Sequence, residues 1–197
     1  MPGVYQPGKL DLVGTILGVA EQERIIDGSR IEVGDAILGL PSSGLHTNGY
    51  TLARTVLGDL DWFQPLPEIG GSTIGEALLA PHRSYLSQVF TMFDGGLDLR
   101  GLAHITGGGL IDNPVRILPE NVDCVLRSSA WRVPPIFNLI QKHGDVSSAE
   151  MAHVFNLGLG MLLFLPQQQV DEARHLVPEA VWVGEVQEGA RRVRFQA

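Results

Sequence analysis

The apolar run "LGLGMLLFLP", residues 157–166, constrains the fold more than any other feature of the sequence. It is about half as long as the roughly 20 residues that a membrane-spanning helix needs, so we interpret it as a buried strand. A strand that is apolar along its whole length must be covered on both faces. This predicts a sheet with helices packed against it.

The other expected elements mix strands and helices without a regular alternation. Strands are predicted at residues 36–40, at 122–128, at 181–186, at 192–195 and in a short segment that ends at 105. Helices are predicted at residues 50–57, 81–93, 134–143, 148–155 and 166–177, and Ser147 with Glu150 three residues later is the expected capping box of the fourth. Residues 59–75 are interpreted as a surface connection. The predicted fold class is therefore α+β, a mixed β-sheet covered by helices.

A second apolar segment, "LDLVGTILGV" at residues 10–19, also has the pattern of a buried strand. It follows a lead-in rich in Pro and Gly, residues 2–8, that does not suit regular structure. A buried strand needs neighbours, and the preceding residues offer none. We therefore expect this strand to pair with another chain.

Charge and cysteine content exclude several classes of protein. The chain has 14 Lys and Arg against 22 Asp and Glu, and a net charge of -8 is the wrong sign for a general nucleic-acid binder. Its one cysteine, Cys124, is predicted to be a buried thiol without a disulfide. The first ten residues do not resemble a secretory signal, so a cytoplasmic location and no membrane contact are expected.

The stretch "SSGLHTNGY", residues 42–50, lies between a predicted strand and a predicted helix, where backbone N–H groups can bind an anion. Gly44 and Gly49 allow close approach of a ligand, and Ser43 and Asn48 add polar partners. His46 can take part in proton transfer or phosphate stabilisation. The alternative is that Ser43 or Asn48 only caps the helix and His46 is an exposed loop residue.

"HITGGG", residues 104–109, follows a strand in the same way. The amides of Gly107, Gly108 and Gly109 can form a nest for an anion, with His104 and Thr106 beside it. A flexible turn or a close packing point is the alternative. "FNLGLGM", residues 155–161, is interpreted as a strand start rather than a third loop of this kind. The remaining histidines show no metal-ligand spacing, so no metal site is predicted.

Taken in this order and at these separations, "MPGVYQPGKLDLVG", "SSGLHTNGY", "HITGGG" and "FNLGLGM" resemble the phosphoribosylformylglycinamidine cyclo-ligase family, the aminoimidazole ribonucleotide synthetases. The resemblance covers essentially the whole chain. It implies an enzyme of purine synthesis in which ATP phosphorylates the formyl oxygen of formylglycinamidine ribonucleotide, a nitrogen attacks the activated carbon, and phosphate leaves. It also implies Mg²⁺ with the nucleotide and a homodimer, with the reaction in the cleft between two domains.

By position, the resemblance places His46 and Asn48 at this cleft and makes Gly107, Gly108 and Gly109 donors to a phosphate. It also implies a domain division: residues 1–26 resemble the last segment of an N-terminal ATP-binding domain, and residues 27–197 resemble the C-terminal domain. The chain alone is therefore expected to be inactive. The alternatives are a non-catalytic binding or dimerisation module, or a related two-domain protein such as thiamine monophosphate kinase, selenophosphate synthetase or a hydrogenase-maturation protein.

Overall fold

The computed structural model describes residues 13–196 of the chain. Its strands are β1 (Asp35–Pro41), β2 (Gly101–His104), β3 (Val122–Arg127), β4 (Leu159–Pro166), β5 (Val181–Glu188) and β6 (Val193–Gln196). Its α-helices are α1 (Tyr50–Val56), α2 (Ile74–Leu78), α3 (Leu86–Asp94), α4 (Gly109–Val115), α5 (Pro135–Gly144), α6 (Ser148–Val154) and α7 (Val170–Leu176). Within the described residues, no helix is long and apolar enough to cross a membrane.

The strand β4 lies inside the sheet, between β2 and β1, as its apolar sequence predicts. The six strands are ordered β2-β4-β1-β5-β3-β6, and every pair is antiparallel except the parallel pair β3 and β6. Successive side chains of β4 point to opposite faces. Leu162 and Phe164 lie in one core with Ile37, whereas Leu163 and Leu165 lie in another with Leu38. The predicted mixed sheet is confirmed.

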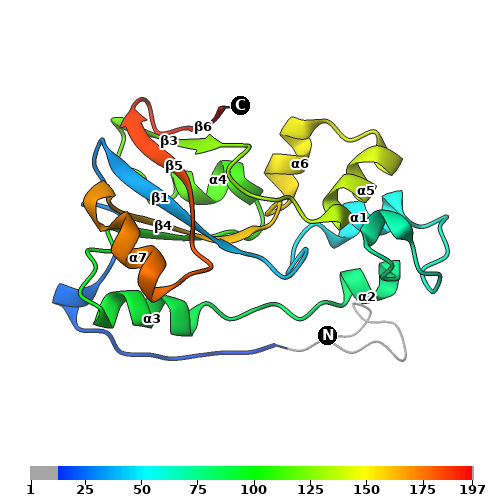
Figure 1. Cartoon of the computed structure of the whole chain (residues 1–197), viewed down its shortest axis with the longest axis horizontal. Helices are drawn as coiled ribbons and strands as arrows, with labels where there is room; N and C mark the ends of the chain where they lie inside the picture. Colours follow the sequence, from blue (N-terminus) through cyan, green and yellow to red (C-terminus); the bar gives the residue numbers. More distant parts are fainter. Residues whose placement is uncertain (1–12, 197) are drawn as a thin grey trace, which may run out of the picture.

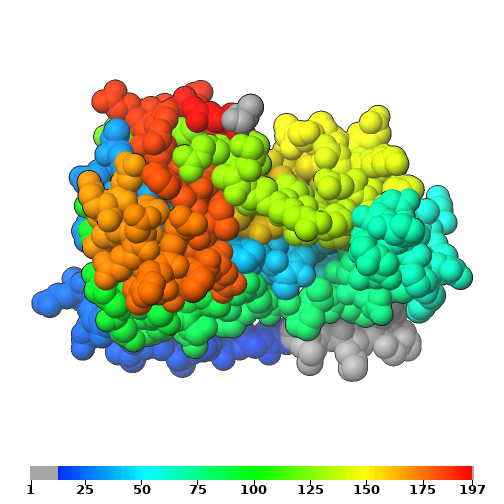
Figure 2. All heavy atoms as spheres, in the orientation of Figure 1, coloured from blue at the N-terminus to red at the C-terminus, as the bar shows by residue number. Residues whose placement is uncertain are grey.

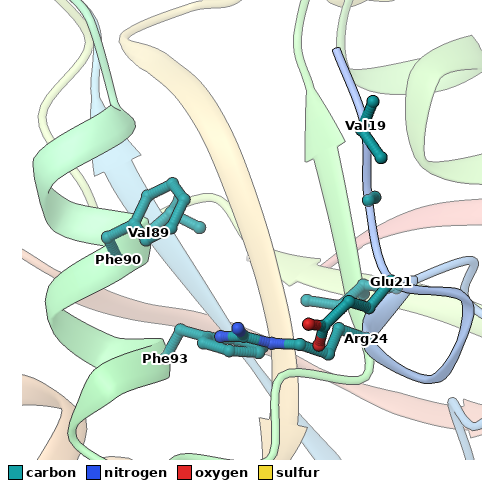
Figure 3. Close-up of a pocket in the computed structure, with 8 residues that line it drawn as sticks. Val19, Glu21, Arg24, Val89, Phe90 and Phe93 are labelled. Atoms are coloured by element: carbon teal, nitrogen blue, oxygen red, sulfur yellow. The ribbon is translucent and has the colours of Figure 1, made fainter.

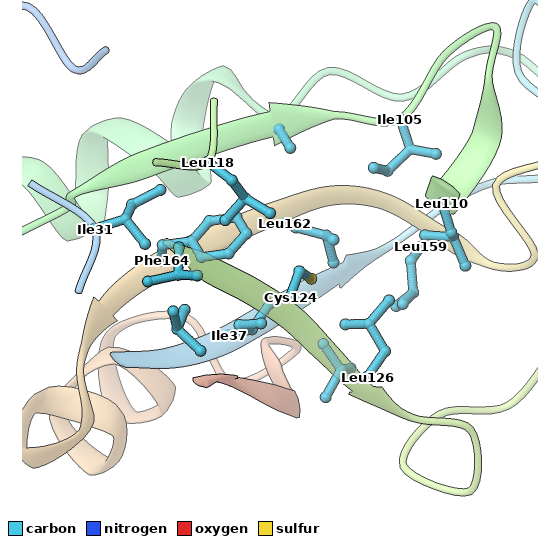
Figure 4. Close-up of a cluster of buried hydrophobic side chains, with 14 residues drawn as sticks. Ile31, Ile37, Ile105, Leu110, Leu118, Cys124, Leu126, Leu159, Leu162 and Phe164 are labelled. Carbon is cyan, nitrogen blue, oxygen red and sulfur yellow. The ribbon is translucent and has the colours of Figure 1, made fainter. Parts of the chain in front are cut away.

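Helices cover the two faces of the sheet unequally (Figure 1). The helices α3 and α7 cover the face that carries Leu163 and Leu165. On the opposite face, Leu110 of α4 belongs to one core with Ile37, Phe164 and the fully buried Cys124 (Figure 4). The prediction of a buried thiol is therefore confirmed.

A third core lies beyond one end of the sheet, where α1, α2, α5 and α6 pack on one another (Figure 1). Phe137 and Phe155 meet there, with their ring centroids 5.6 Å apart. The predicted cap Ser147 accepts a hydrogen bond from the backbone of Glu150 at the start of α6. A complete capping box, formed by Thr73 and Glu76, begins α2 in a region predicted to be a surface connection.

The apolar segment predicted to be a strand at residues 10–19 is not part of the sheet of this chain where the structure describes it, and its pairing with another chain stays a prediction. Residues 13–19 belong to no strand, and Ile16 and Leu17 are 94% and 93% exposed. The segment runs along the outside of α3, as the dark blue chain shows (Figures 1 and 2). Residues 10–12 and the lead-in at residues 2–8 lie outside the described residues. The apolar side chains of residues 13–19 are therefore exposed on the surface of this chain.

The helix predicted at residues 81–93 begins five residues later, at Leu86, and residues 81–85 form no regular element because they are bonded to the end of β1. Tyr85 is 5% exposed and donates its hydroxyl to the carbonyl of Pro41 at 3.0 Å, and Arg83 donates to the same oxygen at 3.2 Å. These bonds hold residues 81–85 against the end of β1. The position matters because it brings His82 to the site.

Candidate functional site

The three glycine-containing motifs meet at one end of the sheet because of the strand order. Both β1 and β2 are antiparallel to β4 and flank it, so β1 and β2 run in the same direction. Pro41 pairs with Leu159, and His104 pairs with Met161. The carboxyl ends of β1 and β2 therefore lie beside the beginning of β4. Residues 42–49, 105–109 and 156–158 continue from these three ends.

The loop at residues 42–49 is fixed by the buried side chain of Asn156. Its Oδ1 accepts from the Ser42 hydroxyl at 2.8 Å and from the Gly158 amide at 2.9 Å. Its Nδ2 donates to the Gly44 carbonyl at 2.8 Å. Ser43 adds a hydrogen bond from its hydroxyl to the carbonyl of Pro81 at 2.6 Å. Sequence reasoning assigned Asn156 to a strand start and missed this role.

His46 occupies the centre of this loop in a conformation that is unusual for a residue with a side chain. Its φ is +61°, in the left-handed region, and it is only 3% exposed. Its Nε2 accepts a hydrogen bond from the Ser43 amide at 3.1 Å, and its Nδ1 has no partner among the described residues. The neutral ring therefore carries its proton on Nδ1. The alternative of an exposed loop histidine is wrong.

The helix-capping alternative for Ser43 and Asn48 is also wrong. The residue that precedes α1 is Gly49, with φ +79°, and no side chain caps this helix. A Cβ at Gly49 would lie 2.2 Å from the ring of Phe155, which explains the glycine. Asn48 instead faces the other loop, since a Cβ at Gly107 would lie 3.2 Å from its Oδ1.

The glycine triplet divides into two parts. The Gly109 amide donates to the Thr106 carbonyl at 3.1 Å, so it is already satisfied within the chain. The amides of Gly107 and Gly108 donate to no acceptor within residues 13–196. Asn113, which is 4% exposed, holds the turn by donating to the Gly109 carbonyl at 2.8 Å and by bonding the Thr106 hydroxyl at 3.1 Å.

Three histidines from separate parts of the sequence come together beside these loops, and we call His46, His82 and His104 the histidine cluster. The rings of His46 and His82 stack with centroids 3.9 Å apart. The Nε2 atoms of His82 and His104 are 3.2 Å apart. His82 and His104 also line a cavity of about 510 Å³ with Tyr85. Sequence reasoning missed His82, because nothing in the spacing of "APHRSY" relates it to the other two.

Gly160 makes room for this arrangement. A Cβ there would lie 1.8 Å from the Tyr85 hydroxyl and 2.7 Å from Cε1 of His46. The predicted strand start at "FNLGLGM" is confirmed by β4, and its glycine also allows a close approach that the sequence did not identify. A separate hollow of about 420 Å³, between residues 19–26 and α3, contains none of the motif residues (Figure 3).

Burial lowers the pKa of two histidines of the cluster, His46 and His104. It lowers the pKa of His46 to about 4, with further lowering by the charges of His82, His104 and Arg83. Burial is also the main cause that lowers the pKa of His104, and the charge of His82 adds to it. His46 is therefore neutral near pH 7, where it offers a hydrogen-bond donor at Nδ1 rather than a positive charge.

This pKa predicts how the free energy of unfolding depends on pH. An unfolded histidine has a pKa near 6.5, so between about 6.5 and 4 the unfolded chain binds the proton that folded His46 excludes. Stability is fully present above this window and is lost as pH falls through it, by up to about 1.4 kcal/mol per pH unit. We expect His46→Asn to reduce this slope in urea unfolding with EDTA present. Asparagine tolerates the left-handed backbone.

The control for this prediction is His143→Ala, at an exposed position in the last turn of α5. Carboxyl groups titrate at the acid end of the same window in all three proteins. The difference between variants therefore isolates the histidine. An unchanged slope in His46→Asn would show that His46 is not the buried neutral group.

Comparison with known proteins reveals a family match over most of the chain. The family described as "AIR synthase related protein, C-terminal domain" matches residues 32–195. A phosphoribosylformylglycinamidine cyclo-ligase of Symbiobacterium thermophilum is 46% identical over 195 residues, which cover 94% of this chain and 55% of the relative. The protein of the same name from Bifidobacterium animalis subsp. lactis is 43% identical, with 91% and 53% covered. The chain spans about half the length of the curated relatives it matches.

Solved structures share the fold at much lower identity. A hydrogenase maturation protein HypE matches with a TM-score of 0.58 and 18% identity, over 85% of this chain and 51% of that protein. A thiamine-monophosphate kinase from Stenotrophomonas maltophilia K279a matches with a TM-score of 0.56 and 14% identity, over 87% and 52%. At these identities the likeness establishes the fold and leaves the chemistry to the site.

Proposed function

This chain belongs to the family of AIR synthase related proteins, whose C-terminal domain it contains, and from that membership we propose that it is the C-terminal half of a phosphoribosylformylglycinamidine cyclo-ligase. The proposed reaction is the ATP-dependent cyclisation of formylglycinamidine ribonucleotide to aminoimidazole ribonucleotide in purine synthesis. We further propose a cytoplasmic homodimer, with residues 1–26 as the end of the N-terminal ATP-binding domain and residues 27–197 as the C-terminal domain.

The observation that carries this proposal is the 46% identity to a cyclo-ligase over 94% of the chain. The thiamine-monophosphate kinase and the maturation protein are only 14% and 18% identical. They support the fold and favour neither of their own activities here.

The site supports roles for two groups of atoms. The free amides of Gly107 and Gly108 are placed to donate to a phosphate of the substrate or nucleotide. Since α1 and α4 are only seven residues long, we assign this binding to the loop amides rather than to helix dipoles. Neutral His46 can donate from Nδ1 to an oxygen of the substrate or pass a proton at that atom. The same side of the proposed substrate site is formed by six further residues: Ser43, Gly44, Asn48, Gly49, His104 and Thr106.

The described residues around Gly108 do not form a magnesium site. Mg²⁺ binds oxygen ligands, commonly carboxylates together with substrate phosphates. Of the loop residues around Gly108, only Asp112 brings a carboxylate, and its side chain is half exposed. We therefore assign no reaction step through Mg²⁺ to this chain and expect the ion to arrive with ATP.

The test of this function is complementation of the 197-residue chain. Alone, the chain is expected to release no ADP and form no product, because it is proposed to supply only one of the two domains that form the site. Turnover should be restored when the chain is mixed with the segment of the Symbiobacterium thermophilum relative to which it does not align. In that mixture His46→Asn should lower turnover about 100-fold or more, whereas His143→Ala should not. Turnover by the chain alone, or none in the mixture, contradicts the proposal.

Calorimetry distinguishes the proposed enzyme half from the alternative, a non-catalytic module. A cyclo-ligase half should bind the ribonucleotide or ATP, even weakly, through the two free glycine amides. A module that serves only protein association should bind neither. Binding that is unchanged in a Gly108→Ala variant would show that these amides are not the contact.

A further inference from the structure

The histidine cluster offers three imidazole groups to one point in space, a chemistry that the cyclisation does not require. One ring nitrogen from each of His46, His82 and His104 can be chosen so that all three lie within 4.8 Å of one another. The residues come from the loop after β1, the segment before α3 and the last residue of β2. The first is buried in the protein and the other two are exposed at the cavity.

We propose that His46, His82 and His104 bind a single divalent transition-metal ion of the class that prefers imidazole, with Zn²⁺ as its representative.

The distances are close to those that such an ion requires. Zn²⁺ binds imidazole nitrogen at about 2.0–2.1 Å, and two nitrogens on a tetrahedral ion are then about 3.3 Å apart. The Nε2 atoms of His82 and His104 are 3.2 Å apart. The third nitrogen must approach by no more than about 1.5 Å, the difference between 4.8 Å and this spacing. The exposed ring of His82 must in addition turn out of its stack with His46, because stacked rings cannot both aim a lone pair at one ion.

A second observation points to a missing partner at the same place. Nδ1 of His46 is buried without any hydrogen-bond partner among the described residues, which is costly in a protein interior. Nε2 of the same ring accepts from the Ser43 amide. Coordination through Nδ1 gives that atom its partner and moves the ring proton to Nε2, whereas coordination through Nε2 replaces the amide and leaves Nδ1 unpaired. In both cases the Ser43 hydrogen bond is lost, which gives the proposal a specific signature.

The chemical type of the three ligands determines which metal ions the site can bind. Three imidazoles without a carboxylate suit Zn²⁺, Ni²⁺ or Cu²⁺, whereas Mg²⁺ requires oxygen ligands. The positive charge of nearby Arg83 is offset by Glu179, whose Oε1 is 2.7 Å from its guanidinium. Three protein ligands also leave one tetrahedral position open toward the cavity. This site is therefore distinct from any Mg²⁺ that accompanies a nucleotide.

The test is a titration of the EDTA-treated 197-residue chain with Zn²⁺, without nucleotide, by calorimetry against a competing chelator. One ion per chain is expected, and Mg²⁺ should not compete. His82→Ala should weaken binding at least 10–100-fold, the loss that even supporting residues of metal sites cause. His143→Ala should leave the affinity unchanged. Since His82 is exposed, its removal should not alter the thermal unfolding of the metal-free chain.

Two spectra complete the test. Co²⁺ in place of Zn²⁺ should give the strong visible absorption of a four-coordinate site, and this absorption should disappear in His82→Ala. The amide resonance of Ser43 should shift on addition of Zn²⁺ in the parent chain only. Equal weakening by His82→Ala and His143→Ala, no binding by the parent chain, or an unmoved Ser43 amide would each overturn the proposal. None of these measurements depends on cyclo-ligase activity.

Discussion

Gly109→Ala is expected to destabilise the chain by about 3–5 kcal/mol, a large part of the roughly 5–15 kcal/mol by which a typical domain is stable. A Cβ at this position would lie 2.2 Å from the carbonyl oxygen of Ala152 and 2.8 Å from those of His153 and Phe155. All three atoms belong to the backbone, so none can rotate away as a side chain can. The residue also has φ +55°, where a side chain adds strain. The close approach of α4 to α6 therefore depends on glycine.

Two other glycines separate the causes of this effect. Gly71 has φ +85°, and a Cβ at this position would have no atom within 4 Å, so Gly71→Ala measures the backbone strain alone, about 1–2 kcal/mol. Gly107 has no positive φ, and its Cβ would meet only the side chain of Asn48, with Oδ1 at 3.2 Å. Gly107→Ala should cost less than about 1 kcal/mol. Urea unfolding of the three variants gives the comparison, and equal losses for Gly109 and Gly71 would refute the packing argument.

Asn156→Ala is expected to cost about 3 kcal/mol and to loosen the loop at residues 42–49. The substitution removes three hydrogen bonds, each with a net worth of about 1 kcal/mol, and leaves the Gly44 carbonyl and the Gly158 amide without their partner. Asn156 is 3% exposed, so water cannot readily replace it. Hydrogen exchange of the amides at residues 42–49 should become faster.

The matched control is Asn138→Ala, at an exposed position on α5. A surface substitution of this kind should change stability by no more than about 0.5 kcal/mol. Asn156→Asp is a second informative variant. It keeps an acceptor for Ser42 and Gly158 but places a carboxylate oxygen against the Gly44 carbonyl, so it should also destabilise at neutral pH. If both Asn156 variants unfold like Asn138→Ala, the side chain does not hold the loop.

Local patterns were sufficient to predict most elements. The apolar run at residues 157–166 contains β4, and Ser147 with Glu150 caps the start of α6. Both were predicted because each signal lies within one strand or one helical turn. Predictions failed where a distant contact decided the conformation. Residues 81–85 were predicted to be helical, but the side chains of Arg83 and Tyr85 bond to Pro41 and these residues form no helix. The apolar segment at residues 13–19 had the composition of a strand, and no described strand pairs with it.

The candidate site could be predicted only in part. The two loops at residues 42–49 and 104–109 were identified because glycines and polar residues follow apolar strands, a pattern that local chemistry explains. His82, Asn156 and Gly160 were not identified as parts of the site. Each acts on residues that are tens of positions away, and a single sequence does not indicate which distant segments meet.

The sequence by itself determined the family, the mixed α+β class and the glycine loops that end β1 and β2, since these depend on local composition and on motifs in a fixed order. Only the tertiary structure decided that those loops are neighbours, because it placed β4 between two strands that run in the same direction. The same arrangement buried His46, held His82 beside the end of β1 and gathered three histidines into one cluster. Burial and strand order are properties of the whole fold, and they set both the pKa of His46 and the proposed metal site.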